Sequence, residues 1–145
     1  MVNATLQNSI RIIAIVFLFI IGLNALAAGY SFIVEPSGKG LGMTTNYLQY
    51  APFTNFLIPG IILFTAIGVF SILTAIMAIK RKGLFPQFIF IEGCLLLGWI
   101  VIQVLMVKDI NWMHITCFCI GIALILAGIM IVPKQNMQYF KKYFS

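Results

Sequence analysis

Charged residues are scarce in this chain of 145 residues. Only 8% of the residues are Asp, Glu, Lys or Arg, whereas 62% are hydrophobic and the mean hydropathy is +1.09. A soluble domain carries about 25% charged residues, so this chain could not cover a water-exposed surface of ordinary polarity. Its apolar content also excludes a disordered protein. The composition therefore predicts an integral membrane protein and excludes a soluble globular enzyme.

Acidic residues, histidine and known catalytic motifs are scarcer still. The chain has three Asp and Glu residues together and one histidine, His114. The sequence contains no H-E-x-x-H, G-x-S-x-G or P-loop motif. One histidine cannot form a zinc site without cysteine or carboxylate ligands beside it. We therefore expect a protein that is not an enzyme and that carries no metal and no cofactor.

The three cysteines do not indicate a disulfide framework. Cys94, Cys117 and Cys119 all lie inside apolar runs, and their number is odd. Cys117 and Cys119 would point about 200° apart on a helix, which cannot close a metal site without further ligands. We expect each cysteine to be a small hydrophobic residue of the core.

Long hydrophobic runs are what the sequence has in abundance. An apolar helix crosses a bilayer with about 20 residues, and such runs cannot be the alternating strands of a barrel. Four segments qualify, at residues 10–34, 56–79, 85–107 and 111–132. The second and third connections are short, which makes consecutive helices antiparallel neighbours. The predicted fold is an all-α membrane protein, an antiparallel up-down bundle of four transmembrane helices that forms a single domain over residues 1–145.

The positive charges predict the orientation of this bundle. Lys and Arg residues near span ends favour the cytoplasmic side. The first and third connections hold only Lys39 and Lys108. Seven of the nine Lys and Arg residues lie in the N-terminal segment, the second connection and the tail: Arg11, Lys80, Arg81, Lys82, Lys134, Lys141 and Lys142. We therefore expect both termini and the tail 133–145 in the cytoplasm, and the loop 35–55 outside.

The net charge of +6 does not indicate a partner other than lipid. The cations flank apolar spans, where they meet anionic lipid headgroups. No basic stripe with interleaved aromatic residues is present, so we expect no nucleic-acid partner. Membrane lipids are the expected partners.

Small residues indicate where helices approach one another. Small side chains let membrane helices pack closely, and a homodimer could use one such face instead. The predicted faces are Ala25 with Gly29 in the first span, Cys94 with Gly98 in the third, and Cys117, Gly121, Leu124 and Gly128 in the fourth.

Polar residues at membrane depth are costly and need an explanation. Glu92 lies roughly 10 Å from the cytoplasmic end of the third span, at 1.5 Å per residue. An ionised carboxylate there is too costly unless it is paired. Three interpretations stay open: a carboxyl that contacts the basic second connection or a buried water, a carboxyl that carries a proton or binds a cation, and a carboxyl that contacts a ligand.

A second group of polar and aromatic residues converges at the outer ends of the spans. Glu92, Trp99 and Gln103 share one face of the third span, because their spacings follow the helical repeat. Asn24, Trp112 and His114 lie at a depth similar to that of Trp99 and Gln103. Two interpretations remain: an outward-opening polar pocket, or an aromatic belt with hydrogen bonds between helices. The predicted ligand-binding set is Asn24, Glu92, Trp99, Gln103, Trp112 and His114.

The first connection is unusually rich in aromatic residues for a loop. Pro36, Ser37 and Gly38 predict a turn, and Tyr47, Tyr50 and Phe53 supply apolar groups. We expect the loop to pack over the end of the bundle, where it could cap the pocket.

Several short motifs resemble a widespread group of small bacterial four-helix membrane proteins, which are similar in overall plan to DoxX-like proteins. The motifs are AAG at 27–29, EPSG at 35–38, LGM at 41–43, PF at 52–53, FLIPG at 56–60, GWIVIQ at 98–103 and Trp112. The resemblance covers most of residues 10–132. It implies a bundle in a bacterial inner membrane, and DoxX-like members are tied to quinone-linked oxidoreductase complexes. No residue matches a catalytic motif of that group.

Three functions follow as hypotheses. The first is a non-enzymatic bundle that binds a lipid-like ligand such as a quinone, or a partner membrane protein, through the outer pocket. The second is an accessory subunit of a quinone-linked membrane oxidoreductase, within a larger membrane complex. The third is a small oligomeric transporter, for which Glu92 and Asn24 are the only candidates for an ion path.

Overall fold

The computed structural model describes residues 3–131 and residue 142, and all regular structure in this part of the chain is helical. The elements are α1 (Ala4–Val34), η1 (Lys39–Leu41), η2 (Thr45–Leu48), α2 (Leu57–Ile62), the π-helical η3 (Leu63–Val69), α3 (Phe70–Ile79), α4 (Phe85–Val107) and α5 (Trp112–Ile131). Four helices are long and apolar enough to cross a membrane: α1, the continuous run Leu57–Ile79, α4 and α5. The predicted all-helical fold with four such helices is confirmed. Four helices of this kind are typical of a multi-pass membrane protein.

The observed helix ends match the expected ones closely except at the start of the chain. The second, third and fourth spans begin at Leu57, Phe85 and Trp112, within a residue of the prediction. The first begins at Ala4 rather than at residue 10, because Asn3 caps it by accepting the backbone N–H of Leu6 at 2.8 Å. The predicted tail 133–145 lies outside the described residues, apart from Lys142.

Apolar side chains cover the outside of all four spans. Leu23, Leu73, Leu105 and Ile129, one from each span, are all more than half exposed. A monomeric soluble protein rarely exposes so continuous an apolar surface, whereas lipid tails accept it. The exposure therefore agrees with the composition.

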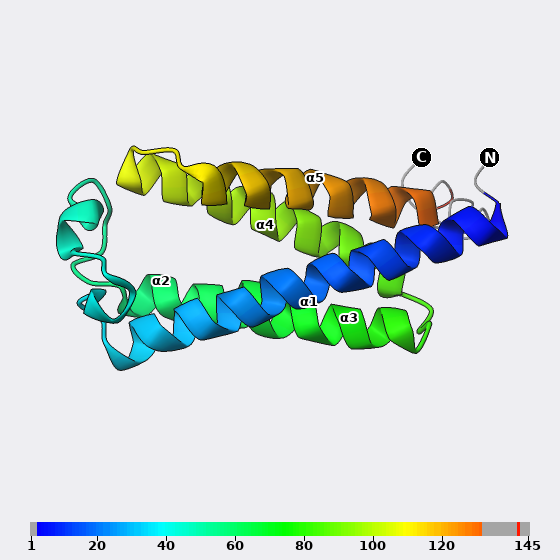
Figure 1. The fold of residues 1–145 in the computed structure, drawn as a ribbon, viewed down its shortest axis with the longest axis horizontal. Coiled ribbons are helices and arrows are strands. Elements are labelled where there is room, and N and C mark those ends of the chain that lie inside the picture. Colours follow the sequence, from blue (N-terminus) through cyan, green and yellow to red (C-terminus); the bar gives the residue numbers. More distant parts are fainter. Residues whose placement is uncertain (1–2, 132–141, 143–145) are drawn as a thin grey trace.

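The helices associate as two pairs. In Figure 1, α1 lies along α2, η3 and α3, and α4 lies along α5. The chain turns back at alternate ends, so the start of α1 and the end of α5 lie together, opposite the long loop. Because α1 runs obliquely, it reaches α5 at the end where the chain begins.

Glycines hold each pair together. A Cβ on Gly29 of α1 would lie 2.7 Å from the backbone N of Phe64. A Cβ on Gly93 of α4 would lie 2.8 Å from the carbonyl oxygen of Gly121 in α5, and one on Gly128 would meet the backbone of Phe90. Small residues thus permit close backbone contact in both pairs.

Two details of the predicted small-residue faces are wrong. Cys94 is exposed, and a Cβ on Gly98 would meet nothing within 4 Å, so these two small residues do not mark a close helix contact among the described residues. Gly93, one position before Cys94, makes the contact with α5 instead. Cys119 is exposed as well, so Cys94 and Cys119 are not core residues, whereas Cys117 is half-buried and packs against the core at the loop end.

The core has two parts along the length of the molecule. One, at the end where the chain begins, joins all four spans and includes Leu18, Ala75, Ile89 and Leu124, all fully buried. The other, at the loop end, includes Phe32, Ile67, Leu96 and Trp99.

The loop between α1 and α2 packs against the bundle, as expected. Leu48 and Phe56 are buried, and the ring of Phe56 stacks on Phe32 with centroids 4.7 Å apart and an interplanar angle of 13°. The ammonium group of Lys108, after α4, lies 3.8 Å from the ring centroid of Tyr50. The loop therefore contacts both helix pairs.

Candidate functional site

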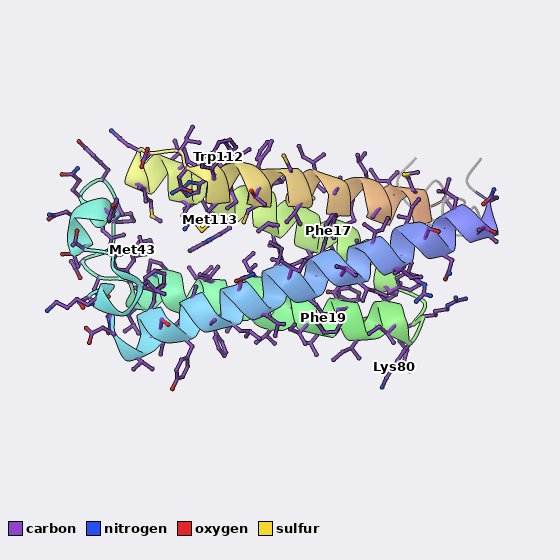
Figure 2. All side chains as sticks on the ribbon, viewed as in Figure 1. Phe17, Phe19, Met43, Lys80, Trp112 and Met113 are labelled. Atoms are coloured by element: carbon purple, nitrogen blue, oxygen red, sulfur yellow. The ribbon has the colours of Figure 1, made fainter. Side chains whose placement is uncertain are left out.

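A cavity of about 640 Å³ lies at the loop end, with walls from both helix pairs. Its floor and sides are mainly apolar and include Ala28 and Phe32 from α1, Leu63 and Ile67 from η3, and Leu96 from α4. The loop contributes Leu41, Met43 and Tyr47. Figure 2 places Met43 at this end together with Trp112 and Met113, whereas Lys80 lies at the opposite end.

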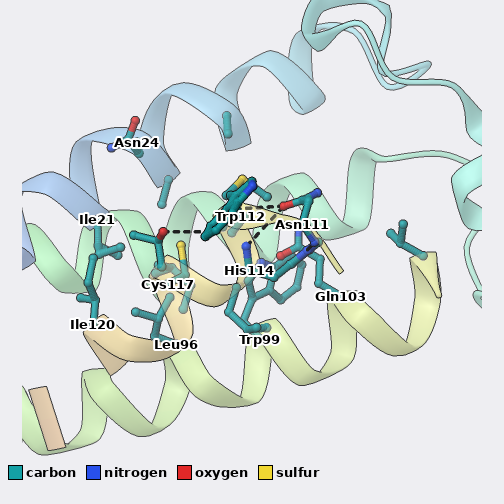
Figure 3. Close-up of a pocket in the computed structure, with 18 of the residues that line it drawn as sticks. Ile21, Asn24, Leu96, Trp99, Gln103, Asn111, Trp112, His114, Cys117 and Ile120 are labelled. Carbon is teal, nitrogen blue, oxygen red and sulfur yellow. Dashed lines mark hydrogen bonds between the residues drawn. The ribbon is translucent and has the colours of Figure 1, made fainter. Parts of the chain in front are cut away.

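Five of the six residues predicted to bind a ligand line this one cavity. They come from three elements and are drawn in Figure 3: Asn24 from α1, Trp99 and Gln103 from α4, and Trp112 and His114 from α5. These five residues, which the sequence placed at a similar depth, therefore also share a cavity. The sixth residue, Glu92, is not among the residues that line it.

His114 is held in place by the first turn of α5. Asn111 caps this helix, since its side-chain oxygen accepts the backbone N–H groups of Met113 at 3.1 Å and His114 at 3.3 Å. In return, Nδ1 of His114 accepts the backbone N–H of Asn111 at 3.2 Å. This reciprocal pair is a capping box with histidine in the place of the usual Glu or Gln. The imidazole is therefore fixed by local structure.

The same hydrogen bond determines what His114 can offer to a ligand. Because Nδ1 accepts a hydrogen bond, the neutral ring carries its proton on Nε2. The side chain is 4% exposed, and Nε2 has no hydrogen-bond partner among the described residues. A buried donor without a partner is costly. His114 therefore places one unsatisfied donor beside a mainly apolar cavity.

The other predicted residues of the cavity are less constrained or already satisfied. Asn24 donates its side-chain amide to the carbonyl of Ile20 in its own helix at 2.8 Å. Trp99 is buried in the wall, whereas Trp112 is 84% exposed. Gln103 is half-buried. His114 is therefore the most specific polar feature of this cavity.

Glu92 lies in a different environment, and this corrects its place in the predicted set. It is completely buried, and its Oε1 accepts the hydroxyl of Ser71 at 2.6 Å, which links α4 to α3. A contact with the basic second connection, which was part of one of the three interpretations, does not form in the described part of the chain. Arg81 of that connection donates to Asn8 instead. Although Glu92 and Trp99 share a buried face of α4, that face meets α3 at Glu92 and reaches the cavity at Leu96 and Trp99.

Asn111 and the π-helical segment are parts of the site that the sequence analysis did not single out. The sequence did contain a signal for Asn111. An Asn followed three residues later by a side chain that can accept its backbone N–H, here His114, is typical of a helix start. The π-helix that places Leu63 and Ile67 on the wall leaves no comparable pattern in an all-apolar run.

The described residues contain no group of three His, Cys, Asp or Glu side chains that could hold a metal ion. Comparisons of the chain with models of known protein families, with curated proteins and with solved structures found no match. The resemblance to DoxX-like proteins therefore stays a prediction, and the function is argued from the cavity itself.

Proposed function

We propose that the protein is a non-enzymatic membrane protein that binds a lipid-like molecule in the cavity at its loop end. The observation that carries this proposal is the buried Nε2 of His114, a hydrogen-bond donor without a partner among the described residues, beside a cavity of about 640 Å³. Ligand sites are commonly about 300–1,000 Å³ and combine apolar walls with a few fixed polar groups.

The chemistry of the walls narrows the class of ligand. Nε2 of a neutral imidazole donates, so the ligand must present an acceptor such as a carbonyl oxygen. The apolar residues of α1, η3 and α4 favour an apolar body attached to that carbonyl. A quinone with a hydrocarbon tail has both features, and Trp99 supplies an aromatic wall.

The two tryptophans make this proposal testable with the purified protein. The chain has only Trp99 and Trp112, and both line the cavity. A short-tailed benzoquinone should therefore quench the intrinsic fluorescence in a saturable manner. His114→Gln retains a capping side chain but removes the imidazole donor, and we expect it to weaken binding roughly threefold to tenfold. Ala28→Leu, which fills part of the cavity, should weaken it more.

The matched control is Ala123→Leu, which adds the same atoms in a shallow apolar groove between α1 and α5. This variant should bind the quinone like the wild type. Equal binding by all variants would contradict the proposal. Equal binding of an alkylbenzene that lacks the carbonyls would contradict the role of His114.

We also propose that the chain lies in a bacterial inner membrane with both termini in the cytoplasm. The support is the distribution of Lys and Arg residues, seven of which fall on the side of the second connection. The loop over the cavity then lies on the outer side.

A further inference from the structure

Two arginines from different helices converge at the end of the molecule opposite the cavity. Arg11 of α1 donates from Nη2 to the side-chain oxygen of Asn8 at 2.8 Å. Arg81, which follows α3, donates from Nη2 to the same oxygen at 3.0 Å. Arg11 also donates from Nη1 to the carbonyl of Ala78 in the last turn of α3 at 2.9 Å. Two guanidinium groups are thus held around one neutral oxygen.

The backbone at Arg81 is unusual for an arginine. The φ angle is 53°, in the left-handed region that favours glycine. The N–H of Lys82 bonds to the carbonyl of Met77, and the N–H of Arg81 to that of Ala78, so Arg81 stands where a helix usually ends in glycine. Gly83 is only two residues further along. The chain therefore accepts a strained arginine where glycine would relieve the strain.

No acidic side chain balances these two charges at this end. The three acidic residues of the chain are Glu35, Glu92 and Asp109. Glu35 and Asp109 lie at the loop end, and Glu92 is bonded to Ser71 in the interior. Lys80 and Lys82 add positive charge beside Arg81. Like charges repel, so the convergence of two guanidinium groups is most favourable around an anion.

We propose that Arg11 and Arg81 bind the phosphate of an anionic membrane lipid. Guanidinium groups match phosphate oxygens with paired hydrogen bonds, and each arginine keeps further N–H groups beyond those used on Asn8 and Ala78. A lipid is the source that fits the position, because Ile12 and Ile79 beside the pair are exposed apolar residues on the lipid-facing surface. This headgroup site is separate from the cavity at the loop end.

The test compares two glycine variants, one at each end of the molecule. Arg81→Gly removes the guanidinium and relieves the left-handed backbone, so it should fold at least as well as the wild type in neutral detergent. Lys108→Gly is the matched control, because Lys108 also has a φ of 53° and one positive charge but lies at the loop end. Each purified chain is titrated with phosphatidylglycerol, phosphatidylcholine and inorganic phosphate while its melting temperature and native mass are recorded.

We expect phosphatidylglycerol to raise the melting temperature of the wild type and of Lys108→Gly, and to bind Arg81→Gly roughly tenfold more weakly. Phosphatidylcholine and inorganic phosphate should have little effect on any chain. An unchanged response of Arg81→Gly, or an equal loss in Lys108→Gly, would overturn the site. A full response to inorganic phosphate would overturn the assignment to a lipid.

Discussion

Buried polar residues in this chain are held by single, identifiable hydrogen bonds. Glu92 accepts from Ser71, and its second oxygen has no partner among residues 3–131. Ser71 and Thr74 lie one turn apart on α3, and both are completely or almost completely buried. Their hydroxyl groups differ in one respect: that of Ser71 bonds to another helix, whereas that of Thr74 bonds to the carbonyl of Phe70 in its own helix.

This difference predicts unequal costs of removing the two hydroxyl groups. Ser71→Ala should lower the free energy of unfolding by about 1–2 kcal/mol, because Glu92 loses its partner in the interior. Thr74→Val should cost less, since the carbonyl of Phe70 keeps its helical hydrogen bond. Denaturant unfolding in detergent measures both. Equal costs would show that the bond between α3 and α4 contributes no more than a local one.

The sequence identified most of the candidate site but could not show what a helix face contacts at each depth. Helical spacing correctly gave Glu92 and Trp99 a common buried face. It could not show that this face meets α3 at one level and the cavity at the next. The fixed orientation of His114 also depends on Asn111; the sequence carried its capping pattern, but the hydrogen bond from the backbone N–H of Asn111 to Nδ1 of His114 appears only in the structure.

At the scale of the helices, only one of two glycines in α4 permits close packing against α5. Gly93 and Gly98 lie on either side of the buried face that carries Glu92 and Trp99, so helical spacing alone could not distinguish between them. Only Gly93 approaches the backbone of α5, at Gly121 and Ile125. The contact thus depends on which side of that face α5 lies, which the sequence did not determine.

Substituting each of these two glycines with alanine tests this difference. Gly93→Ala places a Cβ 2.8 Å from backbone atoms of α5 and should destabilise the fold by about 1–3 kcal/mol. Gly98→Ala meets nothing within 4 Å and should be neutral or stabilising by up to about 1 kcal/mol, because alanine favours the helix. Thermal unfolding in detergent distinguishes them. A larger loss for Gly98→Ala would mean that this exposed face packs against another chain.

The loop over the cavity is held chiefly by one aromatic contact. Phe56 is buried and stacks on Phe32, whereas Tyr50 is exposed and lies under the charge of Lys108. Phe56→Ala should cost about 3–5 kcal/mol of local packing and increase hydrogen exchange at residues 38–51. Tyr50→Ala should cost only about 0.5–1 kcal/mol and change exchange little. Similar exchange in both variants would contradict the role of Phe56.

For the whole molecule, the number and limits of the spans followed from hydropathy, because lipid leaves the backbone few alternatives to a helix. The pairing of the helices followed only in part. The short third connection predicted that α4 and α5 are neighbours, but nothing in the sequence showed that α1 packs along the run Leu57–Ile79 or that the four spans form two pairs. The cavity arises between these two pairs at the end where the loop closes them, so its existence also depended on their arrangement.

The orientation of the whole molecule gives the last prediction. Positive charge gathers at the second connection, whereas the loop that covers the cavity holds only Lys39. Single cysteines at Asn46 and at Gly83, both exposed, report on the two sides in a chain whose native cysteines are replaced. We expect a membrane-impermeant maleimide to label Asn46→Cys in intact cells, and Gly83→Cys only after the membrane is opened. The reverse pattern would place the cavity on the cytoplasmic side and the Arg11–Arg81 site in the outer leaflet, so the ligand would have to enter from within the cell.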